Sequence, residues 1–183
     1  MDRALATRRL ALMSVCVVLN LGLGFLVASL KLPFYLDSIG TVLATALGGL
    51  PVGVLTAVAS VLVGSLYTPT LWAYVVTGIA IALYVNAFYK LGYLKRLLPT
   101  LVGGLGLGIV TAVVSAPVTV VVWKGASLAG ADAVTAFFSA TGRTLADSVV
   151  LGGLATDPVD KLFTSLIALT LLSRVPRAFH ART

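Results

Sequence analysis

Residues 10–30 read LALMSVCVVLNLGLGFLVASL and contain no charged residue. An uncharged apolar run of about 20 residues is long enough to cross the hydrocarbon core of a bilayer as a helix. Basic residues precede the run, as in a signal peptide, but no small-residue cleavage site ends it. We therefore expect a retained membrane-spanning helix over residues 10–30.

The composition of the whole chain is typical of a membrane protein. Of the 183 residues, 59% are hydrophobic and 10% are charged, whereas a soluble domain carries roughly a quarter charged residues. The net charge of +7 does not indicate nucleic-acid binding, because the basic residues flank the apolar runs instead of lining one face. The chain has no glutamate, one cysteine, one histidine and no P-loop, HExxH or GxSxG motif. We expect neither catalysis nor a metal or other cofactor.

Five further helices are predicted from the apolar runs and from the glycines and prolines between them. We place them at residues 36–50, 51–66, 71–89, 97–122 and 158–172. The helices at 36–50 and 51–66 are short for full spans, and together they could form a tight helical hairpin. The predicted fold is an all-α integral membrane protein, a single transmembrane domain over residues 1–183 with a six-helix bundle.

Residues 125–157 fit neither a clear span nor a loop. The segment has apolar character, with Phe137 and Phe138, but it also carries Asp132, Arg143 and Asp147. We predict a lateral or partly inserted helical segment between the fifth and sixth helices. The alternative is a seventh span, which would put the C-terminal tail on the opposite side of the membrane.

The basic residues predict how the bundle is oriented, because cytoplasmic segments carry an excess of Lys and Arg. With six spans and a cytoplasmic N-terminus, nine of the thirteen basic residues lie on the cytoplasmic side. The four on the other side are Lys31, Lys124, Arg143 and Lys161. This asymmetry predicts an even number of spans and two cytoplasmic termini.

Ionisable residues in or beside membrane spans are costly, so each is a candidate for function. In the six-span arrangement these residues lie on the outer side, where they could line one outward-facing cavity. Asn20, near the middle of the first span, would contact a ligand or join two helices. The predicted substrate-binding residues are Asp37, Lys161, Asp160, Arg143, Asp147 and Asn20.

Structural roles compete with these assignments. Arg143 and Asp147 are four residues apart and could form only a surface ion pair. Asp157 precedes a proline and is typical of a helix N-cap. Asp37 and Lys161 could form an ion pair between helices instead of binding a ligand.

Small residues recur at four-residue intervals in the predicted helix at 97–122. They are Gly104, Gly108, Ala112 and Ala116. This spacing puts them on one face, where another helix can approach closely. That face could pack within the bundle or dock a partner's helices.

Several stretches resemble motifs of a known family. Residues 36–41 read LDSIGT and residues 47–53 read LGGLPVG. Residues 157–161 read DPVDK and are followed by an apolar span and by SRVP at 173–176. These stretches resemble the substrate-binding (S) subunits of energy-coupling factor (ECF) transporters, especially the riboflavin-type group.

The resemblance implies a multi-pass protein of the bacterial inner (plasma) membrane that captures a vitamin-like micronutrient. It places the ligand in the outer half of the bundle, under the loop of residues 31–36. It also implies a membrane scaffold subunit and two ATPase subunits as partners. The family's Ala-x-x-x-Ala docking motif has only a partial match here, Thr7 and Ala11.

Three other functions remain as alternatives. The first is a membrane sensor module related to the transmembrane sensors of histidine kinases. The second is a self-sufficient small-molecule permease, which is typically built from inverted repeats with broken helices. The third is a purely structural membrane subunit. The sequence does not indicate which substrate a binding subunit would take.

Overall fold

A computed structural model describes residues 3–127 and 130–175, and within these ranges it is helical with no strand. The predicted all-α fold is therefore confirmed. The elements are α1 (Arg3–Ser29), α2 (Ile39–Gly48), α3 (Leu50–Gly64), the 3-10 helix η1 (Pro69–Tyr74), α4 (Val75–Tyr89), α5 (Leu97–Val121), α6 (Asp132–Ala140) and α7 (Leu145–Arg174).

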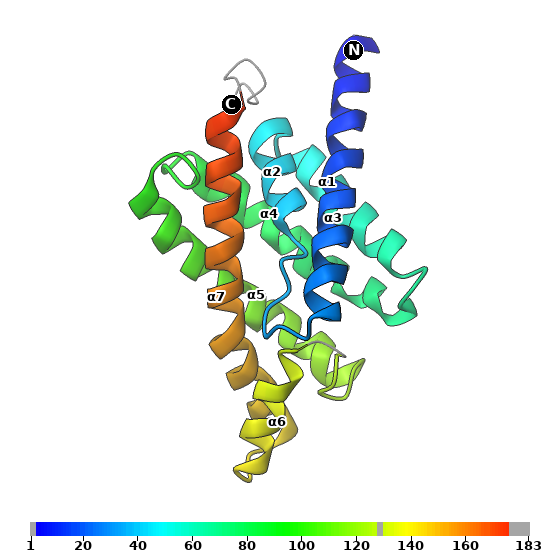
Figure 1. Ribbon diagram of the computed structural model, residues 1–183, viewed down its shortest axis with the longest axis vertical. Helices are drawn as coiled ribbons and strands as arrows, with labels where there is room; N and C mark the ends of the chain where they lie inside the picture. The colour runs from blue at the N-terminus through cyan, green and yellow to red at the C-terminus, as the bar shows by residue number, and fades with distance from the viewer. Residues whose placement is uncertain (1–2, 128–129, 176–183) are drawn as a thin grey trace.

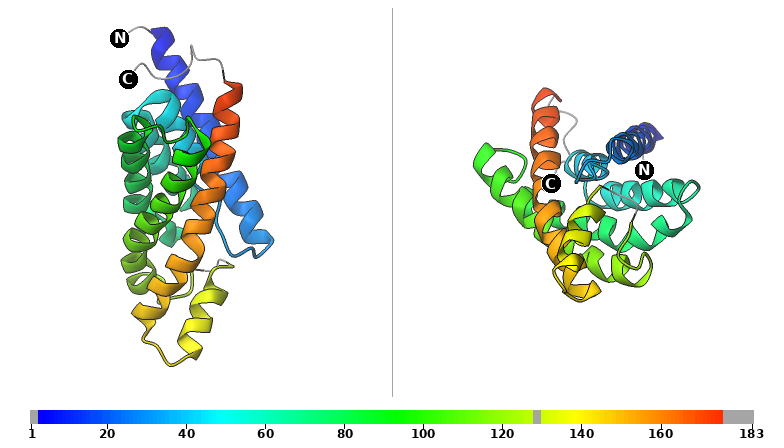
Figure 2. Two further views of the ribbon diagram at one scale, coloured as in Figure 1. Left: turned by 90° about the vertical axis from the view of Figure 1, so that its left-hand side faces the viewer. Right: turned by 60° about the horizontal axis from the view of Figure 1, so that its bottom comes forward.

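The long helices alternate in direction along the molecule (Figure 1). The start of α1 and the end of α7 lie at the same end, which we call the terminal end (Figures 1 and 2). The helix α6 lies at the opposite end, which we call the α6 end. The loop of residues 30–38 lies between the two ends, next to α7 (Figure 2).

The helices α5 and α7 pack closely in antiparallel directions. A Cβ atom added at Gly108 would lie 2.2 Å from the Cα of Pro158, and one at Gly104 would lie 2.9 Å from the Oγ of Ser165. Only glycine allows such an approach of two backbones. The small residues of α5 therefore pack within the bundle.

The last helix begins earlier than predicted, at Leu145 instead of residue 158. Its N-cap is Thr144, whose hydroxyl accepts a hydrogen bond from the backbone N–H of Asp147. Asp157 is therefore not an N-cap, and Pro158 lies inside the helix. A proline in a membrane helix is tolerated where neighbouring helices pack around it, as the glycine face of α5 does here.

The predicted hairpin at residues 36–66 is confirmed. Gly49 links α2 to α3 with φ 81°, a conformation that favours glycine. A Cβ atom added at Gly53 would lie 1.9 Å from the Oγ1 of Thr45, so the two helices pack tightly. They have 10 and 15 residues, and at 1.5 Å per residue both are shorter than the roughly 30 Å hydrocarbon core.

The segment at 125–157 divides between two elements. The helix α6 has nine residues, about 13 Å of helix, which is too short to cross a bilayer. It packs against α7 at the α6 end of the molecule (Figures 1 and 2). Residues 145–157 form the first half of α7, so the prediction of one lateral segment over 125–157 was wrong, and residues 128 and 129 lie outside the described residues.

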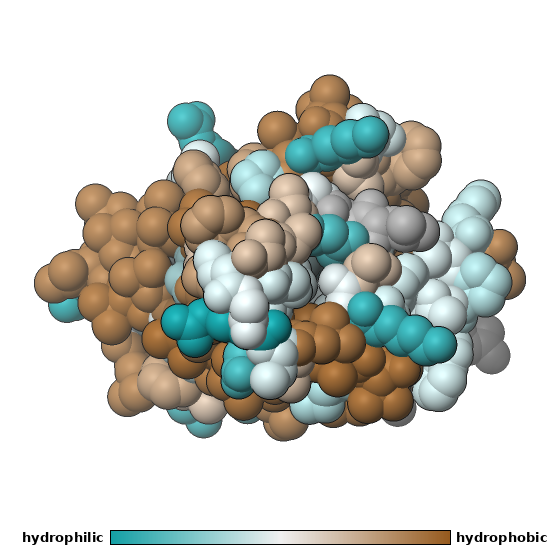
Figure 3. Space-filling model, turned by 90° about the horizontal axis from the view of Figure 1, so that it is seen from below, coloured by the Kyte–Doolittle hydropathy of each residue, from teal (hydrophilic) through white to brown (hydrophobic). Residues whose placement is uncertain are grey.

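Within the described residues, three helices are long and apolar enough to cross a membrane: Leu5–Ser29, Pro69–Tyr89 and Leu97–Val121. Large apolar side chains remain exposed on them, with Phe25 77% and Leu98 70% exposed. Seen from the α6 end, hydrophobic residues cover much of the flanks while polar residues are scattered across the end face (Figure 3). Extended apolar surface of this kind suits lipid better than water, which supports a membrane protein.

Candidate ligand-binding site

Asp160 fastens the loop of residues 30–38 to α7. Its Oδ1 accepts hydrogen bonds from the backbone N–H groups of Tyr35 at 3.0 Å and Leu36 at 2.8 Å. Leu36 has φ 49°, a left-handed conformation that is costly for a leucine. The two bonds hold the loop in this conformation, and we call Asp160 with the two N–H groups the latch.

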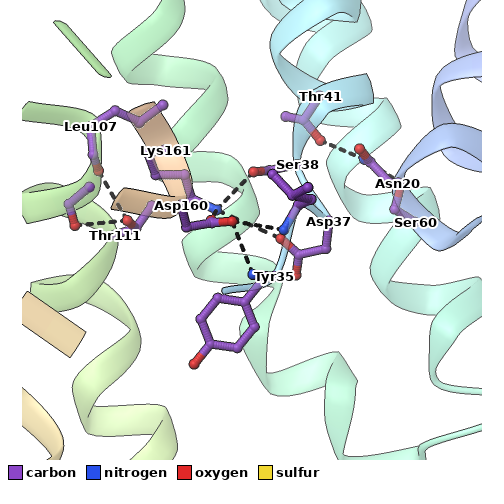
Figure 4. Close-up of polar contacts among 12 residues, drawn as sticks. Asn20, Tyr35, Asp37, Ser38, Thr41, Ser60, Leu107, Thr111, Asp160 and Lys161 are labelled. Atoms are coloured by element: carbon purple, nitrogen blue, oxygen red, sulfur yellow. Dashed lines mark hydrogen bonds and ion pairs between the residues drawn. The ribbon is translucent and has the colours of Figure 1, made fainter. Parts of the chain in front are cut away.

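Lys161, the next residue of α7, compensates the charge of the latch. Its Nζ lies 2.5 Å from Asp160 Oδ2, donates a hydrogen bond to Ser38 Oγ at 2.9 Å and lies 3.7 Å from Asp37 Oδ1. Lys161 and Asp160 are 4% and 0% exposed, whereas the Asp37 side chain is 57% exposed. The loop, the start of α2 and α7 therefore meet at one buried ammonium group (Figure 4).

Asn20 forms a separate, neutral network with α2 and α3 (Figure 4). Its Oδ1 accepts a hydrogen bond from the Gly40 backbone N–H at 2.6 Å, and its Nδ2 donates to Thr41 Oγ1 and Ser60 Oγ at 3.0 Å each. The side chain is buried and its polar atoms have partners. The geometry shows the inter-helix role for Asn20.

A small polar cavity lies between α5, α6, α7 and Tyr35 of the loop. Its volume is about 20 Å³, room for one water molecule. Asp157 of α7 and Asp132 of α6 are on its wall. The hydroxyl groups around it come from Tyr35, Ser115, Thr119, Ser127, Thr135 and Thr156.

Asp157 is the buried carboxylate of this cavity, with 5% of its surface exposed. Both ion pairs found in residues 3–127 and 130–175 belong to Lys161, with Asp37 and Asp160, and neither includes Asp157. Asp132 accepts a hydrogen bond from Ser127 Oγ at 2.8 Å. The cavity thus has an anionic wall without a cation of its own.

The structure brings three of the six predicted site residues together. Asp37, Asp160 and Lys161 meet at the latch, while Asn20 lies in its own network. Arg143 lies in the turn before α7 and Asp147 in the first turn of α7, and both are exposed.

Asp147 takes part in the cap of α7 there. The Thr144 hydroxyl donates to its Oδ2 at 2.7 Å, and the expected Arg143–Asp147 ion pair is not among those of the described residues. Neither Arg143 nor Asp147 is on the wall of the polar cavity, so both residues lie outside it.

Several wall residues of the cavity were not predicted. Tyr35 lies immediately before the LDSIGT stretch, and Ser115 and Thr119 are four residues apart in α5. Hydroxyl residues at that spacing share one face of a helix. Two hydroxyl residues at this spacing in an otherwise apolar span were the sequence feature from which these wall residues could have been predicted.

A larger cavity of about 190 Å³ lies between α4 and α5 near the terminal end. Its wall is mainly apolar and aromatic, and the rings of Tyr84 and Phe88 stack with centroids 4.3 Å apart. The hydroxyl of Tyr93 already bonds to Ser165 at 2.7 Å. A ligand site needs convergent polar groups to orient its ligand, and these are found at the polar cavity instead.

No protein-family model, no curated protein and no solved structure matches this chain.

Proposed function

We propose that this chain is the substrate-binding (S) subunit of an ECF-type transporter. It captures a vitamin-like micronutrient from outside a bacterial cell and contributes binding, not catalysis. A membrane scaffold subunit and two ATPase subunits drive the uptake. The chain crosses the inner membrane six times, and both termini are cytoplasmic.

One observation carries this proposal: a latched loop borders a polar cavity between α5, α6 and α7. Tyr35 is both a latch residue, through its backbone N–H, and a wall residue of the cavity. Releasing the latch therefore changes the cavity directly. Coupling between a loop and a buried polar site is what a binding protein needs to admit and then enclose a ligand.

The size of the cavity sets a condition on this function. Small-molecule pockets usually have about 300–1,000 Å³, whereas this cavity has about 20 Å³. Ligand entry requires the loop of residues 30–38 to move away from α7, which breaks the two latch hydrogen bonds.

The alternating helix directions support an even number of crossings, because they put the start of α1 and the end of α7 at one end (Figure 1). Single cysteines at Leu5, Thr141 and Ser173, all exposed positions, test this arrangement. The native Cys16 is buried and should not react. In intact cells, an impermeant maleimide should label Thr141→Cys only. Labelling of Leu5→Cys and Ser173→Cys from opposite sides would refute the even number of crossings.

Ligand binding and transport are tested on the purified full chain. Mass spectrometry should identify a small molecule retained by the protein, and its dissociation constant should be nanomolar. Vesicles that contain the chain alone should not accumulate this molecule, while vesicles with the scaffold and both ATPases should do so with ATP. Uptake by the chain alone, without ATP, would favour the permease and refute the proposal.

A further inference from the structure

We infer that the ligand of the polar cavity is an organic cation, whose positive group lies beside Asp157. The compound class is a protonated amine or a positively charged nitrogen heterocycle. This inference rests on the proposed ligand-binding function and narrows it to one class of substrate.

The charges around the cavity carry the inference. Asp157, a carboxylate with 5% of its surface exposed, lies on the cavity wall and takes part in neither ion pair of residues 3–127 and 130–175. Asp132 adds another carboxylate on the cavity wall. A buried group of like charges is costly without a compensating ion. A cationic ligand removes this cost and gains binding free energy in doing so.

Lys161 is not available to compensate the negative charge of Asp157. Its ammonium group is already occupied by Asp160, Ser38 and Asp37. The other cationic side chains nearest the α6 end, Lys31, Lys124 and Arg143, are exposed. Among residues 3–127 and 130–175, no cationic side chain forms an ion pair with Asp157, so a bound cation would supply its compensating charge.

The wall chemistry favours an organic cation over a metal ion. In residues 3–127 and 130–175, no group of three or more His, Cys, Asp or Glu side chains is placed to hold a metal. The Tyr35 ring extends away from the latch (Figure 4), and Tyr35 is part of the cavity wall. An aromatic face beside carboxylates suits an organic cation, and the surrounding hydroxyl groups can bond to its polar substituents.

The test compares ligands that differ in charge. Isothermal titration of the purified full chain would use 1-methylnicotinamide, a fixed cation, against nicotinamide, its neutral counterpart. Thiamine provides a larger cation, riboflavin a neutral vitamin and pantothenate an anionic one. We expect at least one cation to bind, and 1-methylnicotinamide to bind about tenfold or more tightly than nicotinamide.

Variants then locate the cationic group. Asp157→Asn should weaken binding of the best cation by about tenfold or more, and the exposed Asp147→Asn serves as the matched control with unchanged affinity. If Asp157→Asn does not fold, Asp132→Asn should weaken the same cation by a smaller factor. An unchanged affinity in every folded cavity variant would overturn the inference.

The experiment distinguishes failure of this inference from failure of the proposed function on which it rests. Tight binding of riboflavin or pantothenate in preference to the cations, or a neutral or anionic molecule retained by the purified protein, would overturn the cationic class and leave the binding subunit intact. Failure of every probe to bind, with no retained molecule, would overturn both.

Discussion

The protein has two buried polar networks of opposite character. The Asn20 network joins α1, α2 and α3 through neutral groups whose hydrogen bonds are satisfied. The Lys161 network joins α7 to the loop of residues 30–38 and contains more negative than positive groups. The first network holds one arrangement of helices together. The second holds a loop that must move and borders an unbalanced cavity.

The difference shows which buried polar groups call for a functional explanation. A satisfied neutral network can be explained by packing alone, because each polar atom replaces a bond to water. A buried carboxylate without an ion-pair partner, such as Asp157, cannot be explained in this way, because helix packing supplies no compensating charge. Substitutions in the two networks should therefore differ in how much stability they cost and in how they change ligand affinity.

The largest effect is expected for Lys161→Met, which removes the only ammonium group of the charged network. Asp160 would remain buried without its cation, and breaking a buried ion pair in this way costs about 3–5 kcal/mol. The free energy of unfolding in mixed detergent micelles measures this loss. Lys90→Met is the control, because Lys90 is exposed and should change stability little.

A stability loss for Lys161→Met as small as that of Lys90→Met would contradict the comparison. It would mean that Asp160 is not charged in the folded protein. The neutral and charged networks would then be energetically alike.

A smaller loss is expected for Asp160→Asn, which keeps the size of the side chain but removes its charge. Lys161 keeps Ser38 and Asp37 as partners in this variant, and hydrogen bonds to charged groups contribute about 1.5–3 kcal/mol, so we expect a loss of about 2–3 kcal/mol. Hydrogen exchange should speed up at the Tyr35 and Leu36 amides, which donate to Asp160. Unchanged exchange at these two amides would show that Asp160 does not hold the loop.

The sequence predicted the fold better than it predicted the site. Apolar runs and their glycines located α1 to α5 and the second half of α7, because helix length and lipid exposure leave a direct pattern in one dimension. The start of α7 was wrong because Asp157 followed by Pro158 has the pattern of an N-cap. Only the close face of α5, with Gly108 against Pro158, shows that the helix continues.

The meeting of Asp37, Asp160 and Lys161 followed from placing charged residues on one side of a six-span arrangement. The wall of the cavity could not be predicted in this way. Tyr35 reaches it through the left-handed turn at Leu36, and Thr119 reaches it from a neighbouring helix. Both depend on contacts between distant parts of the chain.

In the neutral network, Asn20→Ala should cost about 1–3 kcal/mol, because it leaves the buried Gly40 N–H and a serine and a threonine hydroxyl with fewer partners. Asn86→Ala is the control, since Asn86 is only partly buried. Ligand affinity should stay unchanged in the folded variant. A loss of affinity without a loss of stability would place Asn20 in the ligand site.

The smallest change in stability is expected for Asp37→Asn. The Asp37 side chain is 57% exposed and its Oδ1 lies 3.7 Å from Lys161 Nζ, and an ion pair of this kind contributes about 1 kcal/mol or less. Lys161 keeps Asp160 and Ser38 as partners in the variant, so the latch should stay closed. Unfolding measurements should show a much smaller loss of stability for Asp37→Asn than for Lys161→Met. A loss as large as that of Lys161→Met would mean that Asp37, and not Asp160, is the main partner of the ammonium group, and that the charged network is centred on the loop instead of on α7.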